Sequence, residues 1–171
     1  MGGAAGKKIT VSLASISGSG AGKTTFMYKM KQGEIITTTP SIGFNVENVS
    51  YKGLTFEMWD LGGGYNIEPL WKQYFDVSHC IIFMVDSENP EIIDKEREML
   101  QKLMGEKDYK KKLFLIMANK QDLPRAMSVA EITEKLCLNE FSNRTWHIQP
   151  TSVINGEGLN ESMDWIIDNL R

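Results

Sequence analysis

The chain has 171 residues, a net charge of −3, and a composition of 42% hydrophobic and 24% charged residues. These values fit a single globular domain and exclude a disordered chain, which would need fewer apolar residues and a larger net charge. The negative charge argues against bulk electrostatic binding to nucleic acid, and no apolar run reaches the roughly 20 residues of a membrane-spanning helix.

Short apolar runs alternate along the chain with stretches of helical period. Strands are expected at residues 9–16, 44–51, 54–59, 80–85, 113–118 and 146–149. Helices are expected at residues 22–31, 90–104, 129–138 and 159–170. This alternation predicts an α/β fold, a mostly parallel six-stranded sheet with helices on both faces, in which the turn at Lys52-Gly53 forms one hairpin. Ligands of such sheets bind at the carboxyl ends of the strands.

The loop after the first expected strand has the pattern of a phosphate-binding loop. It is rich in glycine and runs directly into an expected helix, so its backbone N–H groups and the helix N-terminus can surround an anion. Lys23 supplies a charge for the β and γ phosphates, and Thr24 a hydroxyl for Mg²⁺. The Gly-Lys-Thr ending disfavours the alternative of a glycine-rich turn before an ordinary helix. The expected nucleotide-binding residues are Gly18, Ser19, Gly20, Ala21, Gly22, Lys23, Thr24 and Thr25.

A second loop, Asn119-Lys120-Gln121-Asp122, follows the buried strand expected at residues 113–118. The Asp122 carboxylate can accept two hydrogen bonds from the N1–H and the amine of guanine, a donor pair that adenine lacks. Lys120 can lay its alkyl stem over the purine, and Asn119 can tie this loop to the phosphate loop. A backbone N–H of Ser152 or Val153 is expected at the base oxygen. This loop argues against the alternative of an ATPase or small-molecule kinase.

Two further loops are expected to sense the γ phosphate. Asp60 ends a strand, where it can hold Mg²⁺ through water, and the Gly63 N–H can bond a γ-phosphate oxygen. A hydroxyl within the threonine-rich residues 37–43 can complete the Mg²⁺ shell when a triphosphate is bound. A solvated surface loop is the alternative for this threonine run taken alone.

These motifs, in this order, resemble the Arf and Arf-like (ADP-ribosylation factor) small GTPases over nearly the whole chain. The shared stretches are residues 22–25, 40–47, 59–63, 118–124 and 156–159, with Asp164 and Trp165. The resemblance implies a Ras-like P-loop GTPase domain over residues 1–171 that cycles between GTP and GDP with Mg²⁺. It also implies a guanine nucleotide exchange factor, a GTPase-activating protein and effectors, in vesicle trafficking or membrane-linked signalling.

The resemblance also assigns individual residues. Ser41 takes the place of the family's switch threonine and joins Thr24 and Asp60 at Mg²⁺. The expected catalytic set is Lys23, Thr24, Ser41 and Gly63. The residues matching an aromatic patch that effectors contact are Phe44, Trp59 and Tyr74; sheet packing is the alternative for them.

The chain departs from the family pattern at Ser17, Ser19, Ser41 and Val153, and most consequentially at Gly64. Gly64 occupies the position of the glutamine that orients the attacking water, and glycine has no side chain for that task. We therefore expect GTP binding with slow intrinsic hydrolysis, unless Asn66 or Glu68 positions the water. The alternative is a non-hydrolysing GTP-binding module that acts through effectors.

The N-terminal extension over residues 1–8 carries Gly2, but the acylation motif is incomplete because its sixth position is Gly6. Residues 3–6 have no large apolar side chain, so we expect no membrane-binding helix there and at most weak or transient membrane contact. Cys80 and Cys137 are expected as buried free thiols in a reducing compartment. Together these features predict a cytoplasmic monomer, with a peripheral position on intracellular membranes as the alternative.

Overall fold

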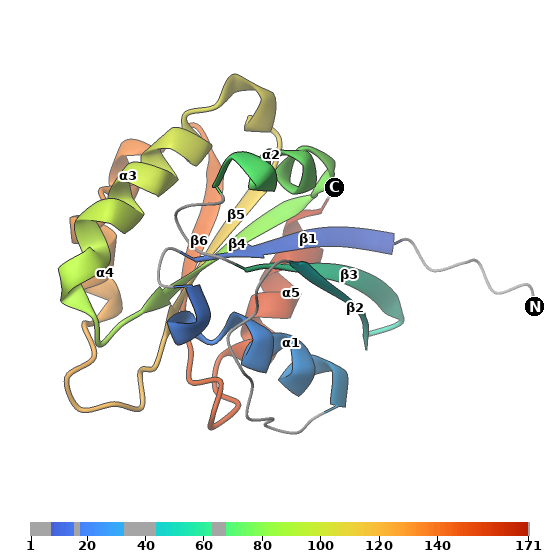
Figure 1. The fold of residues 1–171 in the computed structure, drawn as a ribbon, viewed down its shortest axis with the longest axis horizontal. Coiled ribbons are helices and arrows are strands. Elements are labelled where there is room, and N and C mark those ends of the chain that lie inside the picture. The colour runs from blue at the N-terminus through green and yellow to red at the C-terminus, as the bar shows by residue number, and fades with distance from the viewer. Residues whose placement is uncertain (1–7, 16–17, 33–43, 63–67, 171) are drawn as a thin grey trace, which may run out of the picture.

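A computed structural model describes residues 8–15, 18–32, 44–62 and 68–170 (Figure 1). Six strands form one sheet in the order β2-β3-β1-β4-β5-β6. Their bounds are β1 Lys8–Ala14, β2 Phe44–Tyr51, β3 Leu54–Leu61, β4 Cys80–Asp86, β5 Leu113–Asn119 and β6 Thr145–Pro150. β2 runs antiparallel to β3, and the other neighbouring pairs are parallel. The predicted mostly parallel sheet is therefore confirmed.

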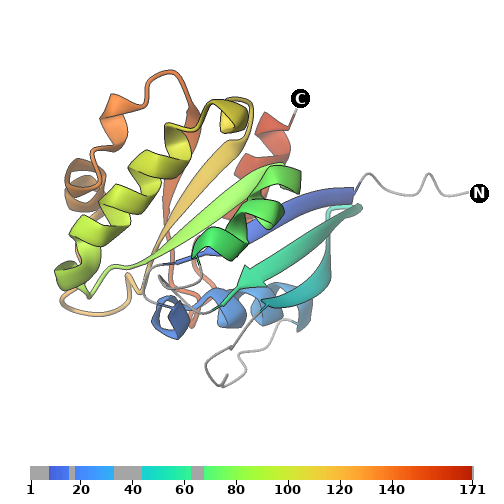
Figure 2. The same ribbon diagram turned by 45° about the horizontal axis from the view of Figure 1, so that its top comes forward.

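Helices cover both faces of this sheet, as predicted. They are α1 Lys23–Gln32, α2 Glu68–Val77, α3 Ile93–Met104, α4 Val129–Lys135 and α5 Leu159–Asn169. In Figures 1 and 2, α2 and α3 lie across the sheet from α1 and α5. Short 3-10 turns are η1 Gly18–Ala21, η3 Pro90–Ile92, η4 Lys107–Tyr109 and η5 Leu138–Glu140.

Each face of the sheet has its own apolar core. Ile81, Phe83 and Val85 of β4 join the core under α2, α3 and α4. Ile82 and Met84, which alternate with them, join the core under α1 and α5. Because successive side chains of a strand point to opposite faces, a strand buried on both sides reads as a continuous apolar run.

The strand register brings the carboxyl ends of the strands together. Leu13 of β1 lies beside Asp60 of β3, and Asp86 of β4 lies beside Asn119 of β5. Ala118 of β5 pairs in turn with the last residue of β6. The loops that follow these strands therefore share one edge of the sheet.

Some elements differ from the sequence-based expectation. Helix α2 was not predicted, and the helix expected at residues 129–138 ends as α4 at Lys135. Cys137 adopts a left-handed conformation, with φ of 56°, which breaks the helix before η5. The predicted hairpin is confirmed, with positive φ at both Lys52 and Gly53, as a type I′ turn requires. No helix among the described residues is long and apolar enough to cross a membrane.

Candidate functional site

The expected phosphate loop lies between β1 and α1, and its lysine is buried beside a carboxylate. Helix α1 begins at Lys23, whose side chain is 3% exposed. Its Nζ lies 3.6 Å from Oδ1 of Asp60, which is fully buried. Burial lowers the pKa of Lys23, and the attraction of Asp60 opposes that shift. The arrangement holds a cation at the carboxyl edge of the sheet, where an anion can reach the helix N-terminus.

The same carboxylate has the character of a divalent-cation ligand. The Thr24 hydroxyl donates a hydrogen bond to Asp60 Oδ2. Oδ1 accepts no hydrogen bond from the residues that the structure describes, although it is buried. A hydroxyl and a carboxylate are hard oxygen ligands of the kind that Mg²⁺ prefers. The described residues hold no cluster of three or more His, Cys, Asp or Glu, so a metal here would need phosphate and water oxygens to complete its shell.

Asn119, at the end of β5, joins three loops through its side chain, which is buried. Its Nδ2 donates to the Ala21 carbonyl at 2.9 Å. Its Oδ1 accepts from the Thr151 hydroxyl and from the Val153 N–H, both at 3.1 Å. The contact with the phosphate loop is the one that the sequence analysis expected; the contacts with the loop after β6 were not foreseen. A Cβ on Gly22, whose φ is +99°, would lie 2.7 Å from the Asn119 Nδ2.

Asp122 is exposed at the end of the same loop, where its carboxylate can meet a ligand. Its Oδ1 accepts a hydrogen bond from the Ser152 hydroxyl at 2.9 Å. The backbone N–H groups of Ser152 and Val153 donate within the protein, to the Glu157 carbonyl and to Asn119. Either N–H would have to exchange its acceptor to reach a base oxygen, so that part of the expectation stays a prediction.

The sequence analysis missed Asp86 and Ser87, which follow the apolar run at the end of β4. Asp86 Oδ2 accepts from Lys120 Nζ at 2.8 Å. The Ser87 hydroxyl accepts from Gln121 Nε2 at 2.9 Å, and its N–H donates to the Asn119 carbonyl at 3.1 Å. The available signal was an acid and a serine directly after a buried strand, at the edge where ligands bind.

Two residues of the expected aromatic patch lie together. The rings of Trp59 and Tyr74 have centroids 4.9 Å apart, and both side chains are half-buried against the core under α2 and α3. The side chains of Phe44 and Ser19 lie outside the described residues. The positions of Ser17, Ser41, Gly63, Gly64 and Asn66, and the side chain of Glu68, lie outside them too.

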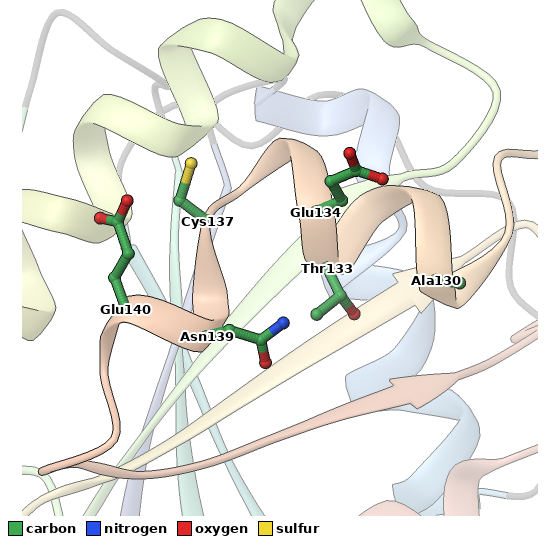
Figure 3. Close-up of a pocket in the computed structure, with 6 residues that line it drawn as sticks. All are labelled: Ala130, Thr133, Glu134, Cys137, Asn139 and Glu140. Carbon is green, nitrogen blue, oxygen red and sulfur yellow. The ribbon is translucent and has the colours of Figure 1, made fainter.

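A hollow of about 680 Å³ lies over α4 and η5, and none of the predicted site residues lines it (Figure 3). Cys137 is half-buried at this hollow, near Glu134 and Glu140. The expectation of a buried thiol is therefore wrong for Cys137, because it lies beyond the end of α4 at the surface. Cys80 is free and fully buried, and burial raises the pKa of its thiol.

Comparisons with known proteins agree with this arrangement. The model of the ADP-ribosylation factor family (Arf) matches residues 7–170. Among solved structures, the Arl6 BBS3 small GTPase from Trypanosoma brucei, with the bound nucleotide analogue GppNp, matches with a TM-score of 0.85 and 27% identity. The match covers 95% of this chain and 96% of that chain.

Proposed function

This chain belongs to the ADP-ribosylation factor family of small GTPases, and we propose that it is a Mg²⁺-dependent guanine-nucleotide switch whose intrinsic GTP hydrolysis is slow. The fold is the Ras-like fold of small GTPases, and GTP binding is the property of that family. The slow hydrolysis, the metal and the individual site residues are our proposal.

The observation that carries the proposal is the junction at Asn119. One buried amide connects the phosphate loop, the loop of Asp122 and the loop after β6. This junction keeps the expected phosphate site and the expected base site at a constant separation. A nucleotide needs both sites at a constant separation, since its phosphates and base are joined covalently.

In this mechanism Lys23 binds the β and γ phosphates, and Thr24, Ser41 and Asp60 would hold Mg²⁺. The ion neutralises the charge of the phosphates when it is bound. Asp60 also keeps the ammonium of Lys23 in place, at 3.6 Å, before a phosphate arrives. Gly63 donates its N–H to the γ phosphate.

At the base, Asp122 accepts from the N1–H and the amine of guanine, which distinguishes guanine from adenine. The Ser152 hydroxyl, 2.9 Å from Asp122 Oδ1, holds that carboxylate in orientation. Lys120 covers one face of the purine with its alkyl stem. The group at the base oxygen is a backbone N–H of Ser152 or Val153 that gives up its present acceptor.

Slow hydrolysis follows from Gly64. Phosphoryl transfer depends on positioning the attacking water, and the family's glutamine has no counterpart in the side chain of glycine. An activating protein's arginine is worth about 10³ to 10⁵ in rate, but the attacking water would still not be aligned unless that protein also supplies a group that positions it. The second candidate function, a non-hydrolysing module that acts through effectors, is favoured by this same residue.

The test is single-turnover hydrolysis of bound GTP with Mg²⁺ by the wild-type chain and by Gly64→Gln. We expect wild-type protein to retain GTP for hours and Gly64→Gln to hydrolyse it faster. Rapid wild-type hydrolysis would contradict the proposal, and Asn66→Ala and Glu68→Ala would then identify the group that positions the water. An unchanged rate in Gly64→Gln would show that residue 64 does not lie at the γ phosphate.

We extend the proposal to the chain as a whole: one GTPase domain over residues 1–171, monomeric and cytoplasmic, with at most transient membrane contact. Trp59 and Tyr74, whose rings lie 4.9 Å apart, are the described part of the proposed effector surface, and Phe44 completes it. An exchange factor and an activating protein set the nucleotide state. Trafficking or membrane-linked signalling is the proposed role.

A further inference from the structure

We propose that Asp86 is a positioning residue for base recognition, which holds Lys120 so that its alkyl stem covers the purine. This inference rests on the proposed function, because it assigns a further residue to the same nucleotide site. The two residues lie at the ends of two neighbouring strands, β4 and β5.

The register places Asp86 directly beside Asn119, so Lys120 is the next residue along the loop. Two backbone contacts hold the segments together: the Ser87 N–H donates to the Asn119 carbonyl at 3.1 Å, and the Met127 N–H donates to the Ser87 carbonyl at 2.7 Å. Asp86 therefore belongs to the same rigid edge as the base-specificity loop.

Both oxygens of Asp86 are engaged. Oδ2 accepts from Lys120 Nζ at 2.8 Å, and Oδ1 accepts from the Glu88 N–H at 3.0 Å. The backbone contact orients the carboxylate, and the carboxylate orients the lysine. The side chains of Asp86 and Lys120 are 13% and 32% exposed, so the pair is partly shielded from water. Charge-assisted hydrogen bonds in such surroundings are short and comparatively strong.

Lys120 needs this support because its side chain is long and its backbone is constrained. A free lysine side chain loses much of its rotamer entropy when it is fixed. The φ of Lys120 is +69°, a conformation that few non-glycine residues adopt. An anchor present before the nucleotide arrives reduces the ordering that binding requires, which is preorganisation.

A second carboxyl group lies behind this pair without competing for the lysine. Glu96 of α3 is fully buried, and neither of its oxygens has a hydrogen-bond partner among the described residues. Burial, with the charge of Asp86, raises the pKa of Glu96 to about 8, so Glu96 is mostly protonated at neutral pH. The negative charge next to Lys120 is therefore that of Asp86.

The test measures the dissociation rate of fluorescently labelled GDP from the full chain. Asp86→Ala should speed release about tenfold or more, and Asp86→Asn by less, because its amide oxygen still accepts from Lys120. Glu91→Ala removes a negative charge from an exposed side chain five residues further along the chain, and it should leave the rate unchanged. Thermal unfolding of each variant without nucleotide shows whether it is folded. If Asp86→Ala does not fold, the GDP dissociation rate of Asp86→Asn is the result that tests the inference.

A double-mutant cycle separates positioning from general support of the fold. Lys120→Met keeps an apolar stem without the charge. In the Lys120→Met variant, Asp86→Ala should therefore cause no further increase in the rate of GDP dissociation. Lys120 is proposed to contact the face of the purine ring and Asp122 the edge of the base. Asp86→Ala should therefore weaken the binding of GDP and of inosine diphosphate (IDP) by the same factor. An equal effect of Asp86→Ala in both backgrounds, or none in either, would overturn the inference. Failure of the wild-type chain to bind GDP would instead overturn the proposed function.

Discussion

The absence of a side chain at Gly22 leaves room for the contact between Asn119 and the expected phosphate loop. Its φ of +99° is unfavourable for other residues, and a Cβ would lie 2.7 Å from Asn119 Nδ2. We expect Gly22→Ala to lower the melting temperature and to weaken GDP binding, because it displaces Asn119 from the Ala21 carbonyl as well as straining the backbone. Thermal unfolding and GDP titration measure the two effects.

Gly53 provides the matched control at the same scale. It also has a positive φ, +78°, but a Cβ there would meet nothing within 4 Å. Gly53→Ala should therefore cost only the backbone strain, about 1–2 kcal/mol, and leave GDP affinity unchanged. If both variants lose stability equally and neither loses affinity, the contact with Asn119 does not support the site.

Glu96 predicts a pH dependence of stability that one substitution removes. Its pKa is raised from 4.5 to about 8, mainly by burial, so the folded chain keeps a proton that the unfolded chain loses. Wild-type stability should fall as pH rises from 4.5 to 8, at a slope of up to about 1.4 kcal/mol per pH unit from this group. In urea unfolding, the free energy of unfolding of Glu96→Met relative to that of wild type should increase up to pH 8 and then stay constant. A constant difference across that range would contradict the assignment.

At the scale of an element, helix α4 is short and depends on its cap. The Ser128 hydroxyl accepts a hydrogen bond from the Glu131 N–H at 3.1 Å, and only seven residues follow in the helix. Ser128→Ala should lower the free energy of unfolding by about 1 kcal/mol, since that N–H loses its acceptor, whereas Ser128→Asp should retain it. Urea unfolding of the two variants gives the comparison; equal losses would mean that the cap contributes nothing.

The elements also show how far sequence patterns reach. Strands β4 and β5 were predictable because burial on both faces makes each a continuous apolar run. Helix α2 was missed, although Trp71 and Phe75 lie one turn apart on it, because aromatic residues are weak helix formers and its packing partners are distant in sequence. The end of α4 was missed because nothing in its apolar spacing marks the left-handed residue Cys137.

Some residues of the candidate site can also be recognised in the sequence, and others only in the structure. The expected phosphate loop and the loop of Asp122 can be recognised as candidates in the sequence because glycines and charged groups have to stand at a constant spacing for their chemistry. Asp86 cannot be, since a single acid after a strand has many explanations. Only the pairing of β4 with β5 places it beside the loop of Lys120.

At the scale of the whole molecule, the proposed site is assembled from the ends of five strands, β1, β3, β4, β5 and β6. A nucleotide that contacts the loops after them should stabilise the domain as a unit, by about 2.7 kcal/mol at a concentration 100 times its dissociation constant. We expect the share that comes through Mg²⁺ to depend on Thr24 and Asp60, the proposed ligands, whose side chains are hydrogen-bonded to each other where α1 begins and β3 ends.

Removal of the metal measures how much of the stabilisation by the nucleotide comes through Mg²⁺. We expect a chelator to accelerate GDP release from wild-type protein and to lower the melting temperature of the GDP complex. Thr24→Val removes the proposed hydroxyl ligand but keeps the pair of Lys23 and Asp60, so its GDP release should be faster and nearly insensitive to the chelator. Thr25→Val changes the neighbouring hydroxyl in the same way and should keep the sensitivity of wild type. If Thr24→Val responds to the chelator as wild type does, the ion is held elsewhere, and Asp60 serves only as the counter-charge of Lys23.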